Sequence, residues 1–266
     1  MLLLLVLLLT NRMLGVRAFL YNAPSLLPRR PTFCIRMTAS AALEVEQKFS
    51  WKQSDDLEDR LRQMGFQNKA SKTIVDWYYD TPNYVLVRQD CWLRCRTVGS
   101  QAMWELKVGN RDHEGSNTTV YMEVEGMEAV FDAVSRRVDN DCDESVDETV
   151  GEVDGFPSPD VPNQAGTSNL RPFARIAASR SSWSVTTGPY ERLSVDLDTT
   201  DSGYAVGEVE ALVQNPDDIA EVKGLIRSFL DELHLQTENP PMGKLETYIF
   251  ERRPELYALC RDLGHM

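Results

Sequence analysis

The feature that most constrains the fold of this sequence is a set of charged residues that recur two positions apart in five separate segments. In an extended strand, residues i and i+2 point to the same face, so each set predicts a strand with one charged face. The residues between the charged ones are mostly apolar, which predicts an apolar opposite face. The sets are Glu44, Glu46 and Lys48; Arg94 and Arg96; Glu105 and Lys107; Asp196 and Asp198; and Glu208 and Glu210.

Two interpretations of these charged faces are open. In an ordinary two-faced sheet they would simply be exposed to water. A solvated face, however, normally mixes Ser, Thr and Gln with single charges, whereas here carboxylate pairs occupy three strands and basic residues mark three. If a barrel turns these faces inward, the carboxylates can hold hard divalent cations, and Arg and Lys can hold phosphate oxygens. The second interpretation predicts a phosphate-binding tunnel that contains a metal.

The remaining periodicity favours a mainly β (α+β) fold, an antiparallel barrel with helices packed outside. Alternating patterns predict a strand at 43–49, further strands between 73 and 125, and three or four strands between 172 and 213. Apolar residues at helical spacing predict helices at 54–64, 127–138 and 217–233, and a shorter helix after Pro254. We expect one domain over residues 41–260.

Two segments lie outside this pattern. Residues 1–40 begin with a leucine-rich run and contain Arg but no Asp or Glu, which predicts a signal segment followed by a transit-like segment. The junction Val16-Arg17-Ala18-Phe19 resembles the two-part plastid leader of algae with secondary plastids; a secretory or mitochondrial leader is the alternative. The stretch at about 139–170 is rich in Asp, Glu, Pro, Ser and Gly, and predicts a flexible acidic insertion.

The net charge of the chain limits the classes of molecule that it is expected to bind. Five of the 28 Lys and Arg residues lie in the leader, so the rest of the chain carries 23 basic against 41 acidic residues. This balance argues against a general nucleic-acid binder, whose affinity depends on excess positive charge. We expect a monomer that binds no nucleic acid and has no stable membrane association once the leader is removed. Neither a P-loop nor a Ser-His-Asp set is visible, and the three His residues lie away from the charged pairs.

A family resemblance is carried by several of these segments. Glu44-Val45-Glu46-Gln47-Lys48 resembles the Glu-x-Glu-x-Lys signature of the CYTH superfamily, the triphosphate tunnel metalloenzymes. From residue 43 to 257 the order and spacing of the further motifs are similar to those of the animal-type thiamine triphosphatases. These motifs are Tyr78-Tyr79-Asp80-Thr81-Pro82, Trp92-Leu93-Arg94-Cys95-Arg96, Trp104-Glu105-Leu106-Lys107, Val195-Asp196-Leu197-Asp198-Thr199 and the segment 203–210. The leader and the acidic insertion depart from that pattern.

The resemblance implies a closed eight-stranded antiparallel tunnel in which Mg²⁺ assists hydrolysis of thiamine triphosphate, a small-molecule substrate, to thiamine diphosphate and phosphate. It implies metal ligands at Glu44, Glu46, Asp196, Asp198, Glu208 and Glu210, with Glu123 close by. It implies substrate contacts from Lys48, Arg94, Arg96, Lys107, Arg180 and Lys244, with Trp92 stacking on the thiamine rings. Among these, Glu46, Lys48 and Lys107 are the predicted catalytic residues.

Some assignments within the resemblance have alternatives. Arg180 and Lys244 match over short stretches only, so they could also be surface charges. Tyr78 or Tyr79 is a further candidate for lining the site, whereas Trp77, Trp104 and Trp183 are assigned to the core. The rival activities are inorganic triphosphatase and adenylate cyclase. From a different class, a non-catalytic polyphosphate-binding module is also open.

Overall fold

The computed structural model describes residues 42–53, 56–109, 117–138, 153, 156–163, 167–235 and 239–266. The predicted leader, the start of the helix predicted at 54–64 and residues 139–152 of the acidic insertion lie outside the described residues. The first described residue, Ala42, opens the first predicted strand.

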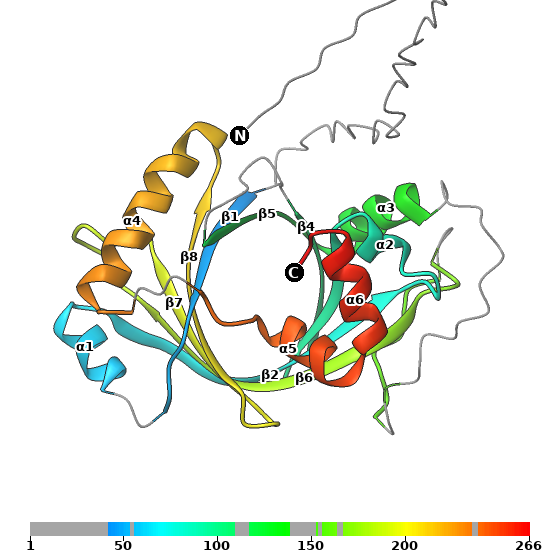
Figure 1. The fold of residues 1–266 in the computed structure, drawn as a ribbon, viewed down its shortest axis with the longest axis horizontal. Helices are drawn as coiled ribbons and strands as arrows, with labels where there is room; N and C mark the ends of the chain where they lie inside the picture. Colours follow the sequence, from blue (N-terminus) through cyan, green and yellow to red (C-terminus); the bar gives the residue numbers. More distant parts are fainter. Residues whose placement is uncertain are drawn as a thin grey trace, which may run out of the picture. The chain divides into compact units, whose positions relative to one another are not determined.

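Eight antiparallel strands close into a barrel (Figure 1). Their order around the barrel is β1-β5-β4-β3-β2-β6-β7-β8, and β1 also pairs with β8. The strands are β1 (Ala42–Phe49), β2 (Gln67–Asp80), β3 (Cys91–Val98), β4 (Gln101–Gly109), β5 (Thr118–Glu125), β6 (Arg171–Ser184), β7 (Ser194–Thr200) and β8 (Ala205–Val213). The predicted closed eight-stranded antiparallel fold is confirmed.

The register of the strands brings the charged sets together inside the barrel. Residues directly opposite each other in an antiparallel pair share a face. Glu46 lies opposite Glu210 and Lys48 opposite Glu208 on β8, while Arg94 on β3 lies opposite Glu105 on β4. The charged faces therefore meet in the interior, and the apolar faces point outward.

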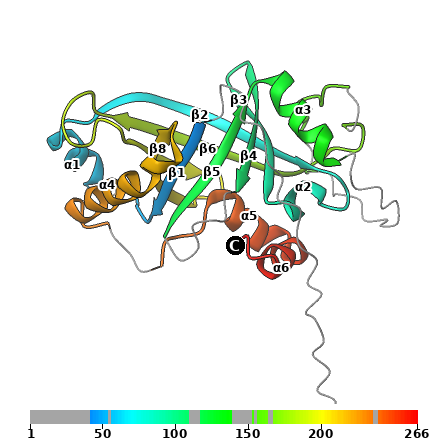
Figure 2. The same ribbon diagram turned by 90° about the horizontal axis from the view of Figure 1, so that it is seen from above.

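The outward apolar faces are covered by helices, so both faces of most strands are buried. The helices are α1 (Leu57–Gln63), α2 (Val85–Arg88), α3 (Met127–Val138), α4 (Ile219–Glu232), α5 (Lys244–Arg252) and α6 (Pro254–Asp262). On one side Phe229 of α4 joins a cluster with Val45 and Val209, and on another Phe131 of α3 packs with Leu106. Figure 2 shows α1 and α4 lying together, away from α5 and α6. No helix among the described residues is both long enough and apolar enough to cross a membrane.

The helices predicted at 127–138 and 217–233 are confirmed within two residues at each end, and α6 is the shorter helix predicted after Pro254. Helix α1 occupies the described part of the helix predicted at 54–64. The structure adds two helices that the sequence analysis does not predict, α2 and α5. Both are short, and a nine-residue helix such as α5 has too few turns for its apolar period to stand out. It also begins only three residues after Pro241, and the pair Pro240 and Pro241 suggests a loop.

The described part of the acidic insertion lies against the barrel. The hydroxyl of Tyr79 donates a hydrogen bond to the carbonyl oxygen of Pro159 at 2.9 Å. Val153 and Val161 pack against the apolar cluster that contains Trp77 and Trp104. Residues 156–163 are therefore attached to the outer surface of the barrel rather than extended into solvent.

Asp80 holds the turn between β2 and α2. Its carboxylate is fully buried and accepts hydrogen bonds from the backbone N–H groups of Thr81 at 2.7 Å, Leu86 at 3.0 Å and Val87 at 2.8 Å. We expect Asp80→Ala to lower the free energy of unfolding by about 2–4 kcal/mol, because three buried donors lose their acceptor. Urea denaturation would measure it. The exposed Asp132→Ala on α3 is the control, with a change below about 0.5 kcal/mol; equal effects in the two variants would contradict the assignment.

Candidate active site

The barrel encloses a cavity of about 340 Å³, the size of a small-molecule site. Its lining comes from seven strands and from the start of α5 and the end of the chain. Among the described residues, eight glutamates and six Lys or Arg side chains line it. The interior is therefore strongly charged, with an excess of carboxylates.

The structure places every predicted substrate-binding residue at this cavity. These are Lys48, Trp92, Arg94, Arg96, Lys107, Arg180 and Lys244. Arg180 and Lys244 are each 9% exposed, which excludes the alternative that they are surface charges. Four of the predicted metal ligands also line the cavity, namely Glu44, Glu46, Glu208 and Glu210.

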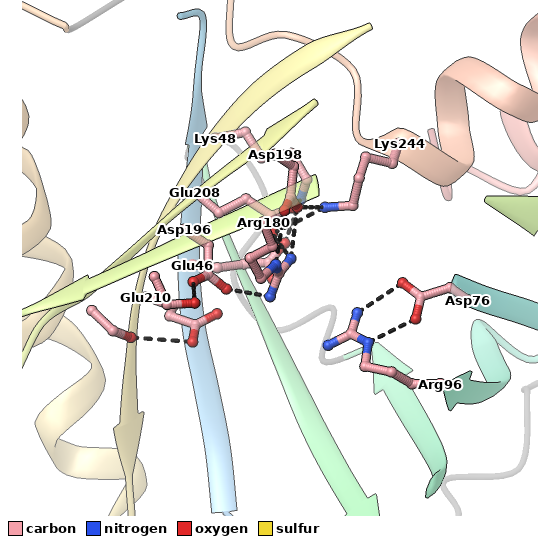
Figure 3. Close-up of polar contacts among 12 residues, drawn as sticks. Glu46, Lys48, Asp76, Arg96, Arg180, Asp196, Asp198, Glu208, Glu210 and Lys244 are labelled. Atoms are coloured by element: carbon pink, nitrogen blue, oxygen red, sulfur yellow. Dashed lines mark hydrogen bonds and ion pairs between the residues drawn. The ribbon is translucent and has the colours of Figure 1, made fainter. Parts of the chain in front are cut away.

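Asp196 and Asp198, predicted as metal ligands, do not line the cavity, because Arg180 pairs with both of them. The Arg180 guanidinium donates to both oxygens of Asp198, at 2.8 and 2.7 Å, and to Asp196. Lys244 donates to the same Asp198 carboxylate (Figure 3). Burial opposes ionisation of Asp198, but Lys244 and Arg180 outweigh it and lower its pKa. In this structure Asp198 is thus an anchor for two cations.

Glu46 bridges two lysines on the wall formed by β1, β5 and β4. One carboxylate oxygen accepts from Lys48, and the other lies 3.3 Å from the Nζ atom of Lys107, which also pairs with Glu44. Thr119 donates a further hydrogen bond to Glu46 at 3.2 Å. Burial raises the pKa of Glu46, but the charges of Lys48 and Lys107 outweigh it and lower the pKa to about 2. Glu46 therefore stays ionised and holds both ammonium groups at the cavity.

The wall formed by β2, β3 and β4 carries the two remaining arginines. Arg94 pairs with Glu105 and lies 3.5 Å from Glu123. Arg96 donates two parallel hydrogen bonds to Asp76, at 2.7 and 2.8 Å. Figure 3 shows the Arg96–Asp76 pair separated from the cluster of charged residues around Arg180. Six cations from four strands and one helix thus surround one cavity.

The carboxylate oxygens of β1 and β8 are the type of ligand that a divalent cation requires. Burial, the nearby charges of Glu44 and Asp196 and a hydrogen bond with Glu44 raise the pKa of Glu210 well above its ordinary range. Carboxylates held this close need a proton or a cation between them. Hard oxygen ligands are what Mg²⁺ and Ca²⁺ prefer. In the part of the chain that the structure describes, no three such groups already converge on one point, since most of them are paired with Lys or Arg.

Residues 42–240 match the CYTH domain family. The chain belongs to the CYTH family. Human thiamine-triphosphatase is 31% identical to it over 230 residues, covering 85% of this chain and 92% of the human protein. The thiamine-triphosphatase of Macaca fascicularis is 30% identical with the same coverage. The family resemblance drawn from the motifs is thereby confirmed.

Solved structures give the same fold as this CYTH chain. A protein of Pyrococcus horikoshii superposes with a TM-score of 0.51 at 19% identity, covering 79% of this chain and 99% of its own. A protein of Vibrio parahaemolyticus gives a TM-score of 0.50 at 15% identity, with 78% and 98% covered. At these identities the likeness concerns the fold alone.

Several residues that line the cavity or pair with its lining residues are absent from the sequence-based set. Asp76 was missed although it precedes Tyr78 by two on the same strand; its role depends on Arg96, which the register places directly opposite. Gly243 caps α5 and lies beside the Lys48 side chain, where an added Cβ would be 2.9 Å from Lys48 Cε. His265 lines the cavity because α6 carries the end of the chain back to the barrel. No local motif could have identified these contacts.

Proposed function

We propose that this chain hydrolyses thiamine triphosphate to thiamine diphosphate and phosphate, with Mg²⁺ as the metal. One observation carries the proposal: six Lys and Arg side chains from separate parts of the sequence surround a single cavity. Triphosphates need many cationic contacts along one short chain of phosphates, and Arg and Lys bind phosphate oxygens well. Membership of the CYTH family, and relatives named thiamine-triphosphatase, support a hydrolase that acts on triphosphates.

The charge of the cavity supports the need for a divalent cation. Each of the six cations is already paired with at least one carboxylate of the chain. When phosphate oxygens take over these cations, the displaced carboxylates are left buried and unpaired, which is costly. Glu44, Glu46, Glu208 and Glu210 would hold the ion. When bound, Mg²⁺ neutralises phosphate oxygens and lowers the pKa of a coordinated water.

The contribution of the protein is positioning and charge stabilisation, which is most of what phosphoryl transfer requires. Lys48 and Lys107, held by Glu46, and Arg180 and Lys244, held by Asp198, form two fixed pairs of positive groups. They orient the phosphates and stabilise the charge that develops on them. Although burial raises the pKa of Glu46, the paired Lys48 and Lys107 lower it to about 2, so in the free chain Glu46 is an anion and not a proton donor.

The aromatic side chains of the cavity support an organic substituent on the triphosphate. Trp92, Tyr78 and Tyr121 line it together with the six cations. Trp92 lies opposite Lys107 in the strand register. An organic ring stacked on the indole would therefore lie next to phosphates bound at Lys107, as in a single substrate molecule. Inorganic triphosphate has no group that could use this contact.

Removing the metal tests the proposal. With Mg²⁺, we expect the full chain to release one phosphate from each thiamine triphosphate and to leave thiamine diphosphate, both identified by chromatography. Excess EDTA should reduce the rate to background, and added Mg²⁺ should restore it. Replacing Mg²⁺ by Ca²⁺ should lower the rate, because Ca²⁺ prefers longer bonds and more ligands. Undiminished release in EDTA would contradict the role of the metal, and pyrophosphate as the product would contradict the bond that is cleaved.

A further inference from the structure

The turn before β3 holds Trp92 by a contact that lies outside the charged network. The indole Nε1–H of Trp92 donates a hydrogen bond to Oδ1 of Asp90 at 3.1 Å. Asp90 has a φ of 58°, in the left-handed region, which Asp tolerates better than most residues. Its N–H donates to the carbonyl of Val87, and its own carbonyl accepts from the N–H of Gly109, both at 2.9 Å. The backbone of Asp90 is therefore fixed on both sides.

Gly109 makes room for the Asp90 carboxylate. A Cβ atom added at Gly109 would overlap that carboxylate, so any other residue at position 109 would displace it. Gly109 lies at the end of β4, opposite Tyr121 and two residues after Lys107. On another side the Nδ1 atom of the buried His265 is 3.9 Å from Asp90. The carboxylate thus lies between Gly109 and His265, with its Oδ1 atom accepting from the indole N–H of Trp92.

We infer that Asp90 and Gly109 are positioning residues that fix the indole of Trp92 against the organic ring of the substrate, and so determine the preference for thiamine triphosphate over inorganic triphosphate. The inference rests on the proposed function, because it names the residues that position Trp92 for the contact with the substrate ring proposed there. The thiazolium ring of thiamine is a cation, and cations are attracted to the face of an indole. A carboxylate bonded to the indole N–H increases the electron density of the ring and strengthens that attraction.

Steady-state kinetics on two substrates test this inference. In Asp90→Ala and in Gly109→Ala, we expect KM for thiamine triphosphate to rise about tenfold, the size of a lost hydrogen bond to a charged group. The values of kcat and KM for inorganic triphosphate should change less than about twofold in both. Asp90→Asn, which keeps an acceptor oxygen but removes the charge, should fall between Asp90→Ala and the wild type. Trp92→Ala sets the upper limit of the effect, and the exposed Asp132→Ala is the control.

The outcomes separate this inference from the proposed function. If the wild type prefers thiamine triphosphate and that preference survives both Asp90→Ala and Gly109→Ala, only the positioning role is overturned. Equal losses on both substrates would show a general structural role and would also overturn it; thermal melts of Asp90→Asn identify a folding defect. Equal kcat/KM of the wild type on the two substrates would overturn this inference alone. If the wild type releases no phosphate from thiamine triphosphate, the proposed function fails and this inference fails with it.

Discussion

Replacing Glu46 by Gln is expected to lower kcat for thiamine triphosphate by about 10²- to 10³-fold, the usual effect of removing one group that stabilises the transition state. The two oxygens of Glu46 receive Lys48 and Lys107. A Gln side chain has one acceptor oxygen, and its NH₂ group would face an ammonium. One lysine therefore loses its orientation, and one carboxylate is removed from the set that would hold the metal. Steady-state phosphate release with saturating Mg²⁺ measures the effect.

The fold should survive this change. Lys107 keeps Glu44, and Lys48 still has Glu208 at 3.9 Å, so neither ammonium is left buried and alone. Circular dichroism and the urea midpoint should stay close to those of the wild type. Glu128→Gln, on the exposed face of α3, is the matched control and should keep full activity. Normal turnover by a folded Glu46→Gln protein would mean that the reaction takes place elsewhere.

Lys107→Ala is expected to lower kcat/KM by a similar factor of about 10²–10³ on both thiamine triphosphate and inorganic triphosphate. Lys107 pairs with Glu44 and Glu46 and lies 5.3 Å from the ring centre of Tyr121. It is thus placed to hold phosphate oxygens, which both substrates share. The loss should therefore be independent of the organic group, unlike the loss expected for Asp90→Ala.

A lysine on the outside of the same barrel provides the control for Lys107. Lys69 lies on β2, is exposed and donates a hydrogen bond to Gln67 at 2.8 Å. Lys69→Ala should leave both substrates unaffected. A Lys107→Ala enzyme that loses activity on thiamine triphosphate alone would contradict the assignment of Lys107 to the phosphates.

The spacing of charges predicts the faces of the strands well but not the depth of each side chain. Glu44, Glu46, Glu208 and Glu210 face the cavity because period-two alternation is a local property of a strand. Asp196 and Asp198 follow the same rule and do face inward, yet Arg180 of the neighbouring strand lies over them. Which side chain covers another depends on the register between neighbouring strands and on the lengths of the facing side chains. The sequence of a single strand does not contain this information.

Contacts formed by turns and by the end of the chain are the part that pattern alone does not predict. Asp76 has its role only because β3 places Arg96 opposite it. The position of the Asp90 carboxylate depends on Gly109, nineteen positions further along the chain, and neither residue belongs to a recognisable sequence motif. Helix α5 is too short for its period to be seen, although Lys244, its first residue, was identified through the family resemblance.

The most direct test of the central claim is phosphate release measured side by side on thiamine triphosphate, inorganic triphosphate and ATP, with the full chain and Mg²⁺. We expect kcat/KM to be highest for thiamine triphosphate, by about tenfold or more over the other two. Inorganic triphosphate has no ring, and the neutral adenine of ATP lacks the positive charge that draws the thiazolium ring to the indole of Trp92. Binding of these compounds without release of phosphate from any of them would contradict the assignment of this charged barrel as a catalytic site.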